Sequence, residues 1–311
     1  MTSAQDEALT LAHQGEALTP AAQGEALTLA HQAEITPLLQ ARWAAADPLD
    51  QTLADPWFAN LYLFRAAHGW RLLRGPLPCI AGQAYDGARL LLPLFDLHTA
   101  PPHALATLLA GHDAFGPLSD AQAALLDPAL FALSQSRDDA DYLYSAEQFR
   151  HYRGTLLQKK RNLVKQLLTA HAVRVTRYTE ALAGEAAQVL AGWLDDKGKQ
   201  AGETDDGPCL EALALAGRLG LDGWMFHIGG QAAGFVLAQR IRPGVAVLRF
   251  AKALPAFKGL YQHMFQHYAC SDPGLQWLNF EQDLGLANFR QTKLSYAPVA
   301  LLSKHRVTLR V

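Results

Sequence analysis

The sequence lacks two features that place a protein outside the cell or in a membrane: paired cysteines and long apolar runs. Its three cysteines, Cys79, Cys209 and Cys270, lie far apart in 311 residues, which argues against a disulfide framework and against a zinc site. No apolar run approaches the roughly 18–20 residues that span a bilayer. The N-terminus carries Asp6 and Glu7 and has no basic start followed by an apolar core, so it does not resemble a signal peptide. We therefore expect a soluble cytoplasmic protein.

An excess of one charge is also missing, as are three common catalytic motifs. Lys plus Arg number 27 and Asp plus Glu 29, so any site for a polyanion must be a local patch. The absence of GxSxG, GxxxxGK[ST] and GxGxxG disfavours a serine hydrolase elbow, a P-loop and a dinucleotide-binding fingerprint.

A short repeat occupies residues 6–32, where DEALTLAHQ, GEALTPAAQ and GEALTLAHQ follow one another. Copies this short cannot bury a core, and Gly15, Pro20 and Gly24 interrupt any helix. We interpret residues 1–34 as a mobile tail, with docking to a partner as the less favoured alternative.

The rest of the chain predicts two α/β domains with mixed sheets, over residues 35–145 and 146–311. Helical spacing of apolar residues predicts one long linking helix over 146–172. In the first domain we expect helices over 37–46, 58–67 and within 119–133, and strands over 88–95 and 139–145. In the second we expect strands over 173–179, 223–229, 232–241, 245–253, 275–281 and 298–311, and helices over 181–197, 210–219, 259–269 and 287–293.

Three segments together resemble a known bacterial family. They are DYLYSAEQFRHYRGTLLQKKRN at 141–162, GLYQHMFQHY at 259–268 and LNFEQDLGLANFRQTKLSYAPV at 278–299. They are similar to the C-terminal domain of phosphatidylglycerol lysyltransferases over about residues 37–306. The resemblance implies two tandem GNAT-like (acyl-CoA N-acyltransferase-like) domains, the second holding the active cleft. It also implies transfer of an aminoacyl group from a charged tRNA to a lipid headgroup, although the acceptor here could equally be a peptide or a soluble amine.

Two carboxylates near the C-terminus are candidates for acid–base chemistry. Acyl transfer requires that the acceptor lose a proton, and a carboxylate can take it. Glu281 and Asp283 lie two residues apart after a predicted strand and point to the same side if the strand continues. Mutual repulsion would then raise one pKa. The alternative is that one carboxylate caps the next helix or pairs with Arg290. Tyr296 could protonate a leaving group, or could simply pack beside Pro298.

Donor phosphates have two candidate positions. Arg290 and Lys293 share a helix face and could clamp a phosphate, or could form a structural network with the carboxylates. Lys258, Gly259 and Leu260 lie where acetyltransferases carry a glycine-rich pyrophosphate loop, although only Gly259 fits that pattern. This departure makes CoA less secure as the donor and a charged tRNA more credible.

Substrate binding is assigned to Asn279 and to Lys160 and Arg161, which belong to the basic run Lys159–Arg161. That run could touch RNA or an anionic headgroup, or be a solvated face. His263 and His267 have the spacing of metal ligands but no third partner, so we expect no metal.

Taken together, these features predict an acyltransferase or aminoacyltransferase with no tightly bound cofactor. Acyl-CoA and aminoacyl-tRNA are the alternative donors, and a small molecule or a lipid is the acceptor. The alternative function is a non-catalytic module that binds a phosphorylated ligand or contacts an anionic membrane.

Overall fold

The computed structural model describes residues 24–43 and 52–310, which divide into two compact units. Of the described residues, unit 1 comprises 24–43, 52–141, 284–286 and 302–310, and unit 2 comprises 142–283 and 287–301. Each unit contains one seven-stranded mixed sheet, as expected for tandem GNAT-like domains. None of the described helices is long and apolar enough to span a bilayer.

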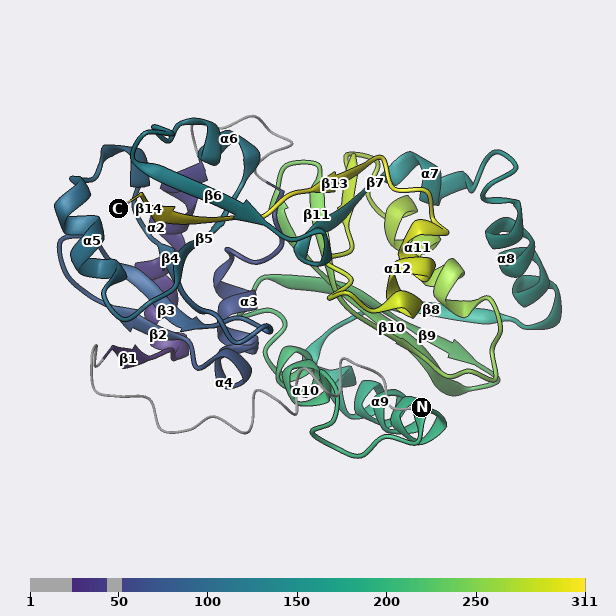
Figure 1. Cartoon of the computed structure of the whole chain (residues 1–311). Coiled ribbons are helices and arrows are strands. Elements are labelled where there is room, and N and C mark those ends of the chain that lie inside the picture. The colour runs from purple at the N-terminus through teal and green to yellow at the C-terminus, as the bar shows by residue number, and fades with distance from the viewer. Residues whose placement is uncertain (1–23, 44–51, 311) are drawn as a thin grey trace. The chain divides into compact units, whose positions relative to one another are not determined.

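Unit 1 is built around the sheet β1-β2-β3-β4-β5-β14-β6 (Figure 1). Its strands are β1 (Glu25–Ala26), β2 (Arg71–Leu73), β3 (Cys79–Gln83), β4 (Arg89–Pro93), β5 (Ala114–Leu118), β6 (Phe131–Gln135) and β14 (His305–Leu309). Its α-helices are α2 (Gln32–Trp43), α3 (Phe58–Leu63), α4 (Arg65–His68), α5 (Pro102–Leu109) and α6 (Asp120–Ala124). β4 and β5 run parallel and the other described pairs are antiparallel.

The third repeat copy differs from the tail that the sequence predicts, because residues 24–32 are part of unit 1. Glu25 and Ala26 pair with β2, and the side chain of Leu27 is buried. A Cβ atom on Gly24 would lie 2.5 Å from a methyl group of Leu73, so glycine permits this close approach. The first two copies lie outside the described residues.

Some predicted boundaries in unit 1 are wrong. The helix expected over 37–46 is α2, which begins at Gln32 and contains Pro37. The helix expected within 119–133 is the short α6, because the chain turns at Asp127 and continues as β6. The expected strand over 88–95 is confirmed as β4.

Unit 2 contains the sheet β13-β7-β12-β11-β10-β9-β8. Its strands are β7 (Asp141–Ser145), β8 (Val173–Arg177), β9 (Leu221–Ile228), β10 (Gln231–Arg242), β11 (Val245–Ala253), β12 (Trp277–Asn279) and β13 (Ala300–Leu302). Its α-helices are α7 (Ala146–His151), α8 (Gln158–Ala170), α9 (Ala183–Lys197), α10 (Asp206–Ala214), α11 (Leu260–Cys270) and α12 (Ala287–Leu294).

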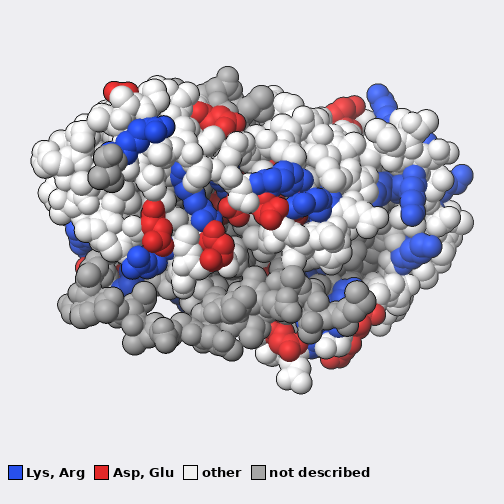
Figure 2. Space-filling model, viewed as in Figure 1, with Lys and Arg blue, Asp and Glu red and all other residues white. Residues whose placement is uncertain are grey.

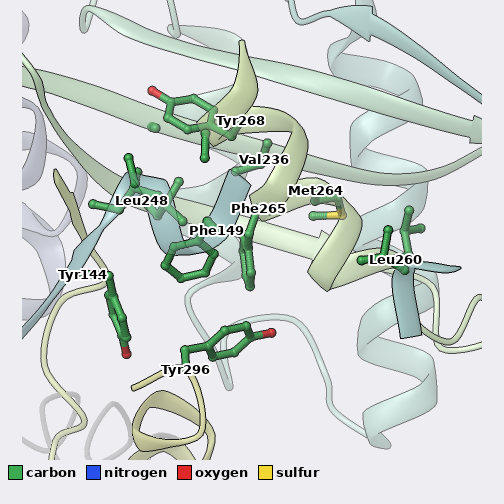
Figure 3. Close-up of a cluster of buried hydrophobic side chains, with 14 of the residues drawn as sticks. Tyr144, Phe149, Val236, Leu248, Leu260, Met264, Phe265, Tyr268 and Tyr296 are labelled. Atoms are coloured by element: carbon green, nitrogen blue, oxygen red, sulfur yellow. The ribbon is translucent and has the colours of Figure 1, made fainter. Parts of the chain in front are cut away.

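Helices cover both faces of the second sheet (Figure 1). α9 and α10 lie on one side, and α7, α8 and α11 lie on the other. The core on the second side is rich in aromatic residues, including Tyr144, Phe149, Phe265 and Tyr296 (Figure 3). This layering fixes the strands that carry the candidate site.

The single linking helix expected over 146–172 is instead two helices, α7 and α8. Tyr152 ends α7 with a left-handed backbone, φ 45°, and its side chain is fully buried. Its hydroxyl donates a hydrogen bond to the carbonyl oxygen of Gln262, 2.9 Å away. Tertiary packing of one aromatic side chain therefore outweighs the local helical preference.

Two strands are exchanged between the two halves of the sequence, because each pairs in the sheet built mainly from the other half. β7 follows the helices and strands of unit 1 along the chain but pairs with β12 in the second sheet. β14 follows unit 2 but pairs with β5 and β6 in the first sheet. A domain boundary drawn at one point along the sequence does not anticipate this exchange.

Candidate functional site

The candidate site lies where two parallel strands of unit 2 separate. β11 and β12 pair from Val245 with Trp277 to Val247 with Asn279, and no further. Just beyond, the register of β11 against β10 shifts between Leu248 and Phe250, so Arg249 occupies a β-bulge. Bulges redirect side chains, and strand divergence is a common place for ligands in such sheets.

A buried ion pair spans this divergence. Arg249 Nη1 lies 2.6 Å from Glu281 Oε1, with side chains 1% and 27% exposed respectively. Gln239 Oε1 accepts hydrogen bonds from Arg249 Nε at 3.2 Å and Nη2 at 2.8 Å. The guanidinium is thus fixed from two sides, while the carboxylate retains some exposure to solvent.

Glu281 has an unusual backbone that Asn279 stabilises. Its φ of 59° is left-handed, a conformation that costs about 1 kcal/mol or more for a residue with a Cβ. The backbone N–H of Glu281 donates to Asn279 Oδ1 at 2.6 Å, and Asn279 is fully buried. The predicted substrate-binding residue Asn279 therefore positions Glu281 through its side-chain oxygen.

Asp283 has a separate environment. It is fully buried and accepts hydrogen bonds from Arg290 Nε at 2.9 Å, Arg290 Nη2 at 3.1 Å and the Tyr142 hydroxyl at 2.5 Å. The condition under which Glu281 and Asp283 would point to the same side is not met, because the strand ends at Asn279 and the backbone turns at Glu281. Of the two arrangements considered for Asp283, the geometry favours the pair with Arg290.

Lys293 stabilises the loop between β12 and α12. Its ammonium group donates to the carbonyl oxygens of Phe280 at 2.7 Å and Glu281 at 3.1 Å, and also to that of Gln282. Arg290 and Lys293 therefore do not converge as a phosphate clamp. Both support the loop that carries Glu281.

Tyr296 belongs to the aromatic core. It is 3% exposed, its ring centroid lies 5.5 Å from that of Phe149, and its hydroxyl accepts a hydrogen bond from Gln262 Nε2 at 2.8 Å (Figure 3). Burial raises the pKa of the hydroxyl well above its ordinary value. Of the two roles considered for Tyr296, packing fits this environment better than proton donation.

Gly259 is required for helix packing. It caps α11 with φ 98°, and a Cβ there would collide with the carbonyl oxygen of Leu163 on α8. Leu260 is buried, and Lys258 is exposed. The residues predicted to form a pyrophosphate loop thus bring α8 against the start of α11.

The surface around α8 is strongly basic. From Gln148 to Thr179 the chain contains no Asp or Glu and eight Lys or Arg residues, namely Arg150, Arg153, Lys159, Lys160, Arg161, Lys165, Arg174 and Arg177. Figure 2 shows blue side chains over α8, on the right of the view, with no red among them. In a chain of formal net charge −2, this is a local patch of the kind a polyanion requires.

The predicted residues Lys160 and Arg161 take part in this surface while also contacting the fold. Lys160 Nζ lies 2.7 Å from Ser295 Oγ and 3.9 Å from the centre of the Tyr296 ring. Partial burial lowers the Lys160 pKa. Arg161 Nη1 donates to the carbonyl oxygen of Tyr152 at 2.7 Å. Lys159 and Lys165 extend from α8 with exposed side chains.

Sequence reasoning missed Arg249, Gln239 and a second buried cation, Lys252. Lys252 lies 2.5 Å from Asp205 and 3.9 Å from the centre of the Trp193 ring. The available signal was the segment VAVLRFAKA, in which two cations interrupt an apolar strand. Buried cations are expensive unless they are paired, so their presence in a core strand indicates partners elsewhere in the fold.

Comparison with known proteins identifies the family. The model of the family described as phosphatidylglycerol lysyltransferase, C-terminal, matches residues 47–307. The chain belongs to this family. A search of curated proteins gives no match. This match confirms the family resemblance that was based on the segments 141–162, 259–268 and 278–299.

Solved structures confirm the fold. A conserved protein of unknown function from Bacteroides thetaiotaomicron is 22% identical, with a TM-score of 0.76 over 93% of this chain and 100% of that chain. L-PGS from Bacillus licheniformis is 13% identical, with a TM-score of 0.59 over 93% and 94%. FemX is 9% identical, with a TM-score of 0.56 over 91% and 96%. At these identities the likeness establishes the fold that this chain shares with these proteins.

Proposed function

We propose that unit 2 is an aminoacyltransferase that moves an aminoacyl group from a charged tRNA to an amine or hydroxyl acceptor. The observation that carries this proposal is the acid-free basic surface of α8, which packs against the start of α11. Gly259 allows α8 to approach at the position where acetyltransferases bind the donor pyrophosphate. An extended polyanion such as tRNA fits this arrangement better than the smaller CoA does.

Glu281 is the residue suited to act on the acceptor. Transfer breaks the ester bond between the aminoacyl carbonyl and the tRNA ribose and forms an amide or ester with the acceptor; the acceptor must lose a proton, and the ribose oxygen that leaves must gain one, so the same proton can pass from acceptor to ribose. The carboxylate of Glu281 is 27% exposed and can take that proton directly or through water, whereas Asp283 is fully buried. Arg249 fixes the orientation of Glu281 across the divergence.

The remaining predicted residues act by positioning in this proposal. Asn279 stabilises the left-handed backbone of Glu281, and Asp283 with Arg290 anchors the loop that follows. Lys293 holds the same loop through three carbonyl groups. Tyr296 packs beneath Lys160 on the surface that receives the donor.

The family description makes a phosphatidylglycerol headgroup one candidate acceptor, and a soluble amine is the alternative. The basic side chains of α8 would also favour contact with an anionic bilayer. These acceptors can be separated by supplying them one at a time.

The test is a transfer assay with charged tRNA as donor. The protein is incubated with tRNA carrying labelled amino acids, and separately with labelled acyl-CoA, in the presence of phosphatidylglycerol vesicles or of small amines. We expect label to move from tRNA to one acceptor class, and Glu281→Gln to lower the rate by about 100-fold or more without weakening tRNA binding. Because Glu281→Gln leaves Arg249 without its anion, Glu281→Asp and a thermal melt of each variant accompany it.

Surface variants test donor binding without disturbing the core. Lys159→Glu with Lys165→Glu should weaken tRNA binding at least tenfold and flatten its salt dependence, because each lost phosphate contact reduces the slope. Lys197→Glu on α9 reverses the charge of one lysine at another exposed position, half the change in charge of the double variant, and should leave binding unchanged. Transfer from acyl-CoA alone, or tRNA binding unaffected by the α8 variants, would overturn the choice of donor.

A second candidate function is a binding module without turnover. The observation that favours it is that both carboxylates near the divergence are engaged in ion pairs. This candidate predicts salt-sensitive binding of tRNA or of anionic vesicles, lost in the same α8 variants, with no label transferred to any acceptor. The transfer assay therefore distinguishes the two candidates.

A further inference from the structure

The segment that covers the edge of the first sheet recurs along the chain. β1 pairs with β2 in antiparallel fashion and lies at the edge of the sheet of unit 1 (Figure 1). It belongs to residues 24–28, GEALT, and residues 15–19 have the same five letters. Residues 6–10 read DEALT and differ only at the first position. The contacts of residues 24–28 therefore show what any copy needs in order to occupy this edge.

The first requirement is a residue without a side chain at the position of Gly24. A Cβ atom there would lie 2.9 Å from the carbonyl oxygen of Leu72 and 3.2 Å from the Cβ atom of Arg71, in addition to its contact with Leu73. A leucine methyl group can move aside, but the backbone carbonyl of a paired strand cannot. Because Arg71 Nε also donates to the carbonyl oxygen of Gly24 at 2.6 Å, the two backbones are held in close approach.

Two side chains secure the docked copy. Leu27 is 3% exposed, and its backbone N–H donates to the carbonyl oxygen of Trp70 at 3.3 Å. The carboxylate of Glu25 accepts hydrogen bonds from Arg74 Nε at 2.9 Å and Nη2 at 3.2 Å. Since that ion pair is exposed, burial of the leucine contributes most of the affinity, and the glutamate helps to set the register.

The second copy meets these requirements and the first copy does not. The second has Gly15 at the position that excludes a side chain, Glu16 at the acidic position and Leu18 at the buried position. The first has Asp6 at the glycine position, so its Cβ atom would collide with the carbonyl oxygen of Leu72. One residue thus decides which of the two can replace the third copy.

The third copy has an advantage over the second. The backbone N–H of Thr28 donates to His31 Nδ1 at 3.1 Å, and His31 Nε2 lies 3.3 Å from Glu25 Oε2. The second copy has Ala22 at the position of the histidine. Docking of the second copy would also close residues 20–31 into a loop, which costs conformational entropy. The third copy is therefore the main occupant of the edge.

From these contacts we infer that the edge of β2 is a docking site for the repeat, at which the second copy competes with the third within one chain. Attachment to the same chain gives the second copy an effective concentration on the order of millimolar, so a weak docking segment can compete. The exchange keeps the sheet edge covered while it releases residues 24–31 from unit 1.

Disulfide trapping in the full chain tests this docking directly. Arg71→Cys is combined with Ala17→Cys, because Ala17 corresponds to Ala26, the residue that pairs with Arg71, and Cys270→Ser removes the exposed native thiol. We expect a disulfide within one chain, formed about tenfold to a hundredfold more slowly than with Ala26→Cys, as for a minor state. Gly24→Val should accelerate it about tenfold or more, because the third copy then fits poorly.

A matched variant separates docking from chance encounters. Gly15→Val leaves both engineered cysteines in place and gives the second copy the side chain that the site excludes. It should slow the disulfide of Ala17→Cys with Arg71→Cys to a rate similar to that of Ala8→Cys with Arg71→Cys. The latter pair reports on the first copy, which the site rejects.

A gain of docking tests the role of the glycine. Residues 7–14 are identical to residues 25–32, so Asp6→Gly makes the first copy a complete duplicate of the third. We expect Asp6→Gly to accelerate the disulfide of Ala8→Cys with Arg71→Cys about tenfold. Asp6→Ala is the control, because it removes the charge but keeps a Cβ atom, and it should give no acceleration.

Hydrogen exchange followed by mass spectrometry tests the competition without engineered cysteines. Gly15→Val alone should leave the protection of β2 unchanged, since the third copy remains docked. Gly24→Val should lower this protection, and the two changes together should lower it about tenfold further, because neither copy then covers the edge. Retained protection in β3 and β4 shows that unit 1 stays folded in each variant.

Either of two results would overturn the inference. One is a disulfide from Ala17→Cys whose rate responds to neither Gly15→Val nor Gly24→Val. The other is a disulfide that joins two chains, visible as a doubled mass without reductant, which would place the second copy on another molecule. Neither result bears on aminoacyl transfer, which is proposed for unit 2, so the two proposals stand or fall separately.

Discussion

At the scale of single residues, two carboxylates that look equivalent in sequence have different roles. Glu281 and Asp283 are separated by one residue, and a continuing strand would place them side by side. The end of β12 at Asn279 and the left-handed φ of Glu281 separate them. Sequence could identify the segment as chemically important, but it could not assign partners, because Arg249 and Tyr142 are distant in the chain.

Asp283→Asn should destabilise the protein by about 3 kcal/mol. The change removes the charge from a fully buried carboxylate and leaves Arg290 without its anion. Urea denaturation at neutral pH measures the loss. Asp196→Asn on α9 is the matched control, because its ion pair with Lys197 is exposed and should contribute less than about 0.5 kcal/mol. Equal stability of the two variants would contradict a structural role for Asp283.

At the scale of elements, the strands predicted over 223–229, 232–241 and 245–253 agree closely with β9, β10 and β11. The packing of one helix against another was harder to predict from the sequence. Gly259 matched part of a phosphate-binding loop in the sequence. The structure shows a different reason for a glycine at this position, which is that a Cβ atom would collide with the backbone of Leu163 on another helix. The left-handed Tyr152 divides α7 from α8 for a similar reason, a tertiary contact that local periodicity does not encode.

The half-buried histidines of α11 make the stability of unit 2 depend on pH. Burial, and secondarily the neighbouring His267, lowers the pKa of His263 from its ordinary 6.5 to about 4. His263 Nδ1 has no hydrogen-bond partner, and its ring packs edge-on against Phe226. Between pH 6.5 and about 4 the unfolded chain therefore binds a proton that the folded chain does not, so the free energy of unfolding falls as the pH falls.

We expect this residue to account for a loss of about 1–2 kcal/mol between pH 7 and pH 4.5, a value reduced for its partial exposure. Urea denaturation at several pH values measures the slope, and His263→Gln should flatten it. His98→Gln, at an exposed position, should not. An identical slope in the two variants would show that His263 is not the source.

At the scale of the whole molecule, the exchanged strands make each sheet depend on a segment from the other half of the sequence. The two α/β halves and their family were predictable from motif order. The exchange was not, because β7 and β14 are ordinary strands by composition, and only long-range pairing decides which sheet receives them.

Removing residues 305–311 should therefore unfold unit 1 selectively. β14 lies between β5 and β6, and the side chain of Val307 is fully buried in the core of unit 1. Without β14, β6 loses its described pairing, and the edge of β5 is exposed. Hydrogen exchange followed by mass spectrometry should show lost protection in β5, β6 and α5 and retained protection in β9, β10 and β11.

A shorter truncation tests whether the loss of β14 itself causes unit 1 to unfold. Removing only Arg310 and Val311 leaves the pairing of β14 intact and costs the two hydrogen bonds of Arg310 to Leu130 and Phe131. Its exchange pattern should stay close to that of the full chain, with changes confined to the start of β6. Loss of protection across β9 to β11 in the longer truncation would mean instead that the two sheets unfold as one cooperative body, despite each having its own core.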